Sequence, residues 1–542
     1  MGRSKVILLL LLVMSTAVSW AQKDRYMVFF KDKSGTPYSV ADPAAFLSPA
    51  AIERRVKHDV QITAQDLPVN PAYINGVKDA GAEVYFTTRW LNGLLVQAED
   101  DVIIQVEALP FVDRVELVAP QARLAPRGRI RVNERRKGTK TSAATNVQLN
   151  MIGLTDMHSD NIRGEGVTIA ILDSGFEGVD VTAPFSHIFQ EGRIDLQASR
   201  DFVYNSDNVF QYDDHGTEVF SVIAAFQPGE FTGGAYKASY QLYVTEEVPT
   251  EYRIEEYNWL FAAERADSAG ADIIQSSLGY YDFDGASMDY LKSQMDGATA
   301  VVSKAAKWAA DRGIIVVVSA GNEGNVSWQI ITAPADVENV LAVAAVDANL
   351  RRSNSSSTGP TSDQRIKPDV AALGVGTSVI ESSGSPGRSS GTSLAAPLIT
   401  SLAAGVLQKY PAATNLEILD AIRKSASQSA KPDNFIGYGV PHFRAVVNYL
   451  EAIAQDNDFE VFPNPFSEGT DSLIIRPRDP GQLGECTIEL IASDGREVFN
   501  ASPRFSWLNN QYSPALANLL PGVYYLKIYA NGRKYTYKLV RK

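Results

Sequence analysis

The stretch Val167-Thr-Ile-Ala-Ile-Leu-Asp-Ser-Gly175 decides the fold expected for the centre of this 542-residue chain. Its first six residues form a continuous apolar run, which is typical of a parallel strand that helices cover on both faces. Asp173 follows the run directly, and in open α/β sheets reactive groups gather where strands end at their carboxyl edge. A lone acidic residue there is more often a turn former or a helix cap, so its role depends on further motifs.

The same pattern continues on both sides of this stretch. Apolar runs recur at residues 272–274, 314–318 and 340–343, and helical stretches lie between them at 254–269 and 299–312, the second closed by Gly313. The alternation predicts that residues 146–455 form an α/β domain with a mainly parallel sheet.

Length and composition limit the classes of protein that this chain can belong to. At 542 residues the chain is too long for one hydrophobic core, which predicts two to four domains. The formal charge is 50 − 63 = −13, which argues against nucleic acid, DNA included, and against anionic membrane surfaces as partners. A single cysteine, Cys486, excludes an internal disulfide framework and a zinc cluster built on cysteines.

The N-terminus has the pattern of an export signal. Arg3 and Lys5 precede an apolar run at residues 6–13, and Ser19 and Ala21 are small residues placed for cleavage. A membrane anchor is the alternative, but the run is shorter than the roughly 20 residues that span a bilayer. Residues 1–21 are therefore predicted to be a signal peptide. Export without disulfides favours a bacterial protein.

Residues 22–122 read as a small α+β domain with the ferredoxin-like order of elements. The order is a strand at 26–30, a helix at 71–80, two strands within 82–97 around an Asn92-Gly93 turn, a helix at 101–108 and a strand at 112–118. Residues 123–145 follow as a linker, in which the stretch from Arg123 to Lys140 holds eight basic residues and one acidic one. Such a solvated connector is also where proteolysis concentrates.

Residues 459–542 change to a period of two, with alternating runs at 487–491, 523–529 and 534–540 and a turn at Asn531-Gly532. This pattern predicts a small antiparallel β-sandwich of about seven strands.

Two more motifs join Asp173. His215, one of only five histidines, lies in Asp213-Asp-His-Gly-Thr-Glu-Val219 at the start of a predicted amphipathic helix. Ser393 lies in Ser389-Ser-Gly-Thr-Ser-Leu-Ala-Ala-Pro397, before a buried helix at 394–407 whose N-terminal N–H groups favour negative charge. Each residue alone has an ordinary interpretation, a packed histidine or a helix cap.

Together, in the order Asp173, His215, Ser393, the three motifs resemble those of the subtilisin-like serine proteases. The resemblance covers roughly residues 150–455 and implies a subtilisin-like catalytic domain, with Ser393 as nucleophile, His215 as general base and Asp173 orienting it. It also implies an oxyanion hole made by Asn322 and the Ser393 N–H. Substrate would pair with the strand segment of Ser276, Ser277, Leu278 and Gly279. Gln275 stands where the family more usually has asparagine.

The resemblance implies a secreted serine endopeptidase that hydrolyses peptide bonds in proteins through an acyl-enzyme. It implies no metal and no cofactor for the chemistry. Family members often bind structural calcium, but no acidic loop here matches such a site convincingly.

The outer blocks carry resemblances of their own. Residues 22–122 resemble the family's inhibitory propeptides, which implies a zymogen; an unrelated α+β module is the alternative. Residues 459–542 resemble the type IX secretion sorting domain of certain Gram-negative bacteria, through Val461-Phe-Pro-Asn-Pro-Phe466, Leu520-Pro-Gly-Val-Tyr-Tyr-Leu526 and the basic end Lys538-Leu-Val-Arg-Lys542. The implied partners are protein or peptide substrates, the chain's own propeptide and the secretion machinery, and the implied location is the medium or the cell surface. The alternative for this block is a carbohydrate-binding or capping module.

Two rival functions stay open at this point. The chain could be a surface adhesion protein that uses an inactive protease fold as a scaffold, although a scaffold has no reason to keep all four catalytic positions. It could also be an esterase or lipase, but the order of the motifs and the absence of Gly-x-Ser-x-Gly at Ser393 argue against that.

Overall fold

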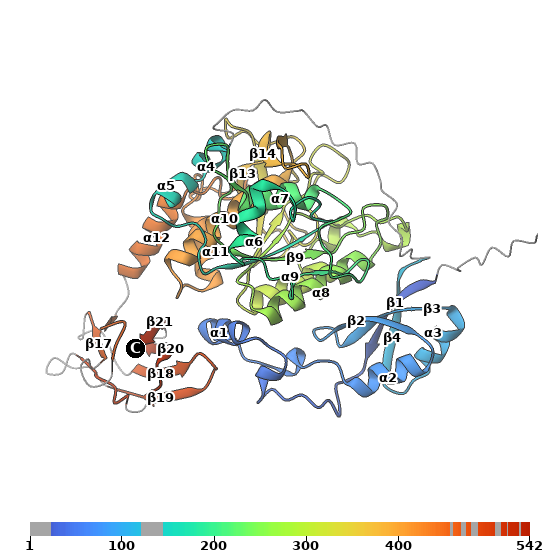
Figure 1. Cartoon of the computed structure of the whole chain (residues 1–542), viewed down its shortest axis with the longest axis horizontal. Coiled ribbons are helices and arrows are strands. Elements are labelled where there is room, and N and C mark those ends of the chain that lie inside the picture. The colour runs from blue at the N-terminus through green and yellow to red at the C-terminus, as the bar shows by residue number, and fades with distance from the viewer. Residues whose placement is uncertain are drawn as a thin grey trace, which may run out of the picture.

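The structure is a computed structural model that describes residues 23–120, 145–455, 459–467, 473–478, 486–503, 511–516, 519–530 and 533–542. Figure 1 shows three parts: an N-terminal domain in blue, a central domain in green to orange, and a C-terminal β domain in red. The predicted signal peptide, almost all of the predicted basic linker and the Asn531-Gly532 turn lie outside the described residues. None of the described helices is both long enough and apolar enough to span a bilayer.

The N-terminal domain is a four-stranded antiparallel sheet in the order β2-β3-β1-β4, with helices α2 and α3 packed on it. Its elements are β1 (Asp24–Phe30), α1 (Pro49–His58), α2 (Pro71–Asp79), β2 (Glu83–Thr88), β3 (Gly93–Ala98), α3 (Asp100–Glu107) and β4 (Val112–Ala119). The ferredoxin-like order is confirmed. Helix α1 belongs to a long insertion between β1 and α2 that the sequence pattern did not predict.

The predicted Asn92-Gly93 turn is wrong in detail. Thr88 pairs with Gly93, so the connection consists of residues 89–92 and Gly93 is the first residue of β3. A side chain at Gly93 would meet the Val28 carbonyl oxygen at 2.4 Å. This glycine therefore permits the close approach of β3 to β1, and Asn92, with a φ of 50°, provides the left-handed turn residue.

The central domain is built on a seven-stranded sheet in the order β13-β12-β11-β10-β5-β9-β6, in which every neighbouring pair is parallel. The predicted mainly parallel sheet is thus confirmed. Its strands are β5 (Thr168–Asp173), β6 (Arg200–Asp201), β9 (Ser239–Val244), β10 (Ile273–Ser276), β11 (Ile315–Ser319), β12 (Leu341–Val346) and β13 (Val370–Leu373).

Helices cover both faces of this sheet because its strands are apolar on both sides. Ile169 and Ile171 of β5 belong to one core with α7 (His215–Ala224) and α10 (Thr392–Lys409). Ala170 and Leu172 belong to the other, with α8 (Ile254–Ala269) and α9 (Val301–Asp311). The remaining elements are α4 (Asn146–Met151), α5 (Leu154–Ser159), α6 (Ser186–Gln190), β7 (Phe226–Gln227), β8 (Phe231–Thr232), β14 (Thr377–Ile380), β15 (Pro386–Ser389), α11 (Asn415–Lys424) and α12 (Phe443–Gln455).

The C-terminal domain packs two antiparallel sheets around one core. One sheet pairs β16 (Phe459–Phe462) with β17 (Ile474–Pro477), and the other has the order β19-β18-β20-β21. The strands of the larger sheet are β18 (Cys486–Ala492), β19 (Glu497–Ala501), β20 (Gly522–Ala530) and β21 (Arg533–Arg541). The described residues give six strands, against the predicted seven or so, and the two-sheet β architecture agrees with the alternation in the sequence.

Candidate active site

The structure brings Asp173 and His215 into direct contact. Asp173 is the last residue of β5 and is fully buried, and His215 is the first residue of α7. The Nδ1 atom of His215 lies 2.6 Å from Oδ1 of Asp173, which also accepts from the backbone N–H of Ser174 at 2.8 Å. Any side chain at Gly216 would meet the Gly175 carbonyl oxygen at 2.3 Å, so this glycine allows the start of α7 to lie so close to the end of β5.

Ser393 lies in the first turn of α10, beside the segment that follows β10. Its side chain is almost fully buried, with 6% exposed, and its hydroxyl donates to the carbonyl oxygen of Ser277 at 3.3 Å. In return, the Ser277 hydroxyl donates to the Ser393 carbonyl oxygen at 2.8 Å. The Ser393 hydroxyl is therefore held at a helix N-terminus, where free N–H groups favour a developing negative charge.

Asn322 follows β11 and is fixed to the start of the same helix. Its side-chain oxygen accepts from the backbone N–H of Thr392 at 3.0 Å and from the Thr392 hydroxyl at 3.1 Å. Because the oxygen is engaged with the residue before Ser393, the amide NH₂ is the part of this side chain that can donate to a substrate.

The segment of Ser276, Ser277, Leu278 and Gly279 begins at the last residue of β10 and lies against Ser393 through Ser277, and its side chains have different roles. The hydroxyl of Ser276 accepts from Nε1 of Trp259 in α8 at 2.9 Å and is fully buried, so Ser276 can meet a substrate only through its backbone. A side chain at Gly279 would meet the Thr332 hydroxyl at 2.2 Å, so this position must stay small. Leu278 is buried, with 5% exposed.

Gln275 has a role that sequence reasoning missed. Its side-chain oxygen accepts from the Thr400 hydroxyl of α10 at 2.5 Å, and its amide donates to the Ser277 hydroxyl at 2.8 Å. Since Ser277 in turn donates to Ser393, a buried chain of hydrogen bonds, called the relay below, connects Thr400 of α10 through Gln275 and Ser277 to Ser393 at the start of the same helix. The only signal in the sequence was that glutamine stands where asparagine is more usual.

A family model described as the subtilase family matches residues 164–439, which contain Asp173, His215, Asn322 and Ser393. The chain belongs to the subtilase family. A model described as a peptidase S8 propeptide domain of Bacteroidota matches residues 25–136, and one described as a secretion system C-terminal sorting domain matches residues 460–542.

Several curated subtilases are similar to this one. Subtilisin E of Bacillus subtilis is 29% identical over 304 residues, which cover 55% of this chain and 68% of that protein. Thermostable alkaline protease of Halalkalibacterium halodurans is 25% identical over 342 residues, 63% of this chain and 84% of its own. Serine protease AprX of Bacillus subtilis is 30% identical over 315 residues, 52% and 66% of the two chains. Among solved structures, MycP3 protease from the type VII (ESX-3) secretion system is 22% identical, covers 57% of this chain and 89% of its own, and has a TM-score of 0.46.

These matches give the subtilase its general function. It is a serine endopeptidase, made as a zymogen with an N-terminal propeptide, and secreted or displayed at the cell surface of a Gram-negative bacterium.

The propeptide of this subtilase packs its sheet against α8. Met27, Phe29 and Leu95 share a core with Tyr257 and Phe261 of that helix. Beside this apolar contact lies a buried charge cluster centred on Asp267 of α8, which is 2.5–2.8 Å from three propeptide arginines, Arg54, Arg55 and Arg89. Burial alone would raise the pKa of Asp267, but the three guanidinium groups together hold it well below its usual range.

Proposed function

We propose that Ser393 is the nucleophile of this protease, that His215 is its general base and that Asp173 orients His215. The observation that carries the proposal is the 2.6 Å contact between Nδ1 of His215 and Oδ1 of the fully buried Asp173. A carboxylate in this position holds the imidazole in the tautomer whose other nitrogen, Nε2, can accept a proton.

The reaction then proceeds by acyl transfer. The Ser393 oxygen attacks the carbonyl carbon of the scissile peptide bond as its proton passes to Nε2 of His215. The tetrahedral intermediate collapses when His215 gives that proton to the leaving nitrogen. Water then attacks the acyl-enzyme as His215 takes a proton from it, and His215 returns this proton to the Ser393 oxygen when the acyl group leaves.

The negative charge on the former carbonyl oxygen needs donors that are already in place. We assign that role to the amide NH₂ of Asn322 and the backbone N–H of Ser393. The bond between the Asn322 oxygen and Thr392 supports this assignment, because it ties one donor to the residue beside the other. The segment of Ser276, Ser277, Leu278 and Gly279 would pair with extended substrate through its backbone. These steps use side chains and backbone groups alone, with no metal or cofactor, and structural calcium is left open.

The outer domains would act before and after catalysis. We propose that the propeptide is removed by cleavage in or just after the basic linker, residues 123–145, which lies almost wholly outside the described residues. N-terminal sequencing of the mature enzyme tests this, and a mature chain that begins near Gln22 would contradict it. The C-terminal domain would be recognised by the type IX secretion machinery.

An organophosphate probe that labels activated serines tests the assignment of Ser393. The wild-type enzyme should be labelled at Ser393, and Ser393→Ala or His215→Ala should lose nearly all peptidase activity, by about 10⁶-fold, the loss measured in subtilisin. Ser390, an exposed serine in the same segment, offers the matched control, because Ser390→Ala should keep both label and activity. A wild-type enzyme that takes no label would instead favour an inactive scaffold.

A further inference from the structure

Helix α1, in the insertion of the propeptide, lies between the protease domain and the C-terminal domain (Figure 1). Its two long sides face different neighbours, because residues three and four apart share one side of a helix. Arg54 and His58 face the protease, and Glu53 and Val56 face the C-terminal domain, with Asp59 just past the helix end.

The side of α1 that faces the protease is buried and makes hydrogen bonds and ion pairs to it. The Arg54 guanidinium donates to the carbonyl oxygens of Ala271 and Arg312 at 2.6 and 3.1 Å, and it pairs with Asp267 at 2.5 Å. His58 packs on Gly313, where an added side chain would meet its ring at 2.6 Å. Because α1 is part of the propeptide, removal of the propeptide takes the whole helix away from the protease.

The other side of α1 is acidic and meets a basic face of the C-terminal domain. Asp59 lies 2.9 Å from Lys527 and 3.0 Å from Lys534, the first on β20 and the second on β21. Glu53 accepts from the Tyr525 hydroxyl at 2.6 Å and lies 3.3 Å from Lys538. The side chain of Lys527 is only 2% exposed in this arrangement, and its ammonium group lies against Asp59.

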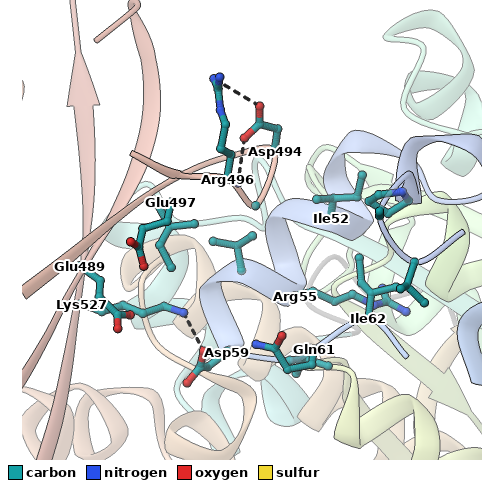
Figure 2. Close-up of a pocket in the computed structure, with 17 residues that line it drawn as sticks. Ile52, Arg55, Asp59, Gln61, Ile62, Glu489, Asp494, Arg496, Glu497 and Lys527 are labelled. Atoms are coloured by element: carbon teal, nitrogen blue, oxygen red, sulfur yellow. Dashed lines mark hydrogen bonds and ion pairs between the residues drawn. The ribbon is translucent and has the colours of Figure 1, made fainter. Parts of the chain in front are cut away.

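Apolar groups complete the contact. Gly495, in the turn between β18 and β19, lies against Val56 and Ile52, since a side chain there would meet their methyl groups at 3.4 and 3.8 Å. Figure 2 shows the cleft of about 650 Å³ that continues from this point, lined by α1 and the segment after it on one side and by Glu489, Arg496 and Lys527 on the other.

The direct approach of the C-terminal domain to the protease is looser. Where Tyr525 and Lys538 face the protease residues Asp272 and Gln408, a cavity of about 400 Å³ separates them. Glu53 and Lys57 of α1 line the same cavity. The hydrogen bonds and ion pairs to the C-terminal domain described above therefore come from the propeptide and not from the protease domain.

We propose that the acidic side of α1 is a docking surface for the C-terminal domain, so that removal of the propeptide also releases the C-terminal domain from this contact. The partner surface is the basic face made by Tyr525, Lys527, Lys534 and Lys538. Propeptide cleavage then exposes this face of the sorting domain, because the acidic groups that hold it leave with α1. The inference goes beyond the proposed function and rests on contacts that do not involve Ser393.

Lysine labelling with an acetylating reagent, followed by mass spectrometry, tests this docking surface. Ser393→Ala is used to hold the full-length precursor intact, and the intact mass confirms that it is uncut. Lys527 should label at least about tenfold more slowly in this precursor than in mature enzyme that retains residues 459–542. Lys424, which is 53% exposed and pairs with Asp420 of its own helix, should label equally in both forms and serves as the internal control.

Charge reversal separates docking from a simple loss of fold. In the intact precursor, Glu53→Lys with Asp59→Lys should expose Lys527 to labelling, while Asp113→Lys, at an exposed position on β4, should leave it protected. Adding Lys527→Glu and Lys538→Glu to the reversed pair places opposite charges against each other again. This combination should restore the compactness of the precursor, which small-angle scattering measures. The proposal is overturned if Lys527 is equally reactive in precursor and mature enzyme, if it stays protected after charge reversal, or if the double reversal fails to restore compactness.

Discussion

The side-chain oxygen of Asn322 accepts a hydrogen bond from the backbone N–H of Thr392, 3.0 Å away. This bond connects the end of β11 to the start of α10, so two elements far apart in the sequence are fixed to each other one residue before Ser393. It also settles the orientation of the amide, because an oxygen engaged with Thr392 leaves the NH₂ group as the donor.

We predict that Asn322→Ala lowers kcat by about 10²–10³, the effect of removing one oxyanion donor. KM should change by far less, since the donor engages the transition state more strongly than the substrate. Steady-state kinetics on a small peptide measure both values. A change confined to KM would mean that Asn322 positions substrate instead.

Gln275 should act as a positioning residue for Ser393. We predict that Gln275→Ala lowers kcat by about tenfold or more and leaves KM within about threefold, because the relay orients the nucleophile without touching substrate. Unfolding free energy should also fall by about 1–3 kcal/mol, since buried partners lose their hydrogen bonds. Gln275→Asn, which restores an amide, should recover part of kcat. A loss of stability with kcat unchanged would reduce Gln275 to a purely structural role.

The parts of this fold that the sequence predicts well are its long apolar or helix-forming stretches. The apolar run before Asp173 and the helix Ile254–Ala269 lie where the sequence places them, although neither has a single apolar face: β5 is buried on both sides and α8 is buried around most of its circumference. Asp173, His215 and Ser393 all lie at or next to the end of a strand or a helix. In a parallel α/β sheet such ends gather at one edge of the sheet.

The insertion between β1 and α2 illustrates what periodicity cannot show. Helix α1 is short and carries Arg54 and Arg55 on a buried side, which a sequence pattern reads as solvent-facing. Their burial depends on Asp267, more than 200 residues away in the chain, and pairing of this kind is a property of the tertiary structure alone.

The Asp267 cluster should dominate the affinity of the propeptide for the mature enzyme. We predict that Asp267→Ala weakens inhibition by added propeptide, residues 22–122, by about 10²-fold or more, because buried arginines then lack their counter-charge. Asp311→Ala is the matched control. Asp311 forms an exposed pair with Lys307, so inhibition should change less than about twofold. Inhibition constants on purified enzyme decide the matter, and equal effects of both substitutions would contradict the prediction.

His58 should make propeptide binding sensitive to mild acid. Burial, and then the positive charges of Lys57 and Arg54, lower the pKa of His58 well below its usual value of 6.5. Nδ1 of His58 accepts from the backbone N–H of Asn415 at 3.4 Å, which also requires the neutral ring. The complex thus binds fewer protons at His58 than the free propeptide does, so affinity is fully present above pH 6.5 and is lost as pH falls below it.

The expected loss from His58 is up to tenfold in affinity per pH unit below 6.5. His58→Asn keeps an acceptor for Asn415 and cannot be protonated, so its inhibition constant should lack this component. The measurement is the ratio of the two inhibition constants between pH 5 and pH 7.5, which cancels the titration of other interface groups. A ratio that stays constant over this range would show that His58 does not titrate on release.

The last prediction concerns removal of the C-terminal domain. A chain that ends at residue 458 loses a domain with its own core, and α12, the last helix of the protease domain, ends at Gln455. We expect the protease to fold and to process itself, and kcat/KM on a small peptide should change less than about threefold because residues 459–542 contribute nothing to the active site. Its location should change sharply, from the surface or medium to the periplasm. A stabilising cap predicts the opposite, namely insoluble or heat-sensitive enzyme with unchanged export, and a carbohydrate-binding module predicts normal export with lost adhesion to polysaccharide. Cell fractionation combined with a peptide assay separates these outcomes, and normal release of the truncated chain to the medium would contradict the sorting role.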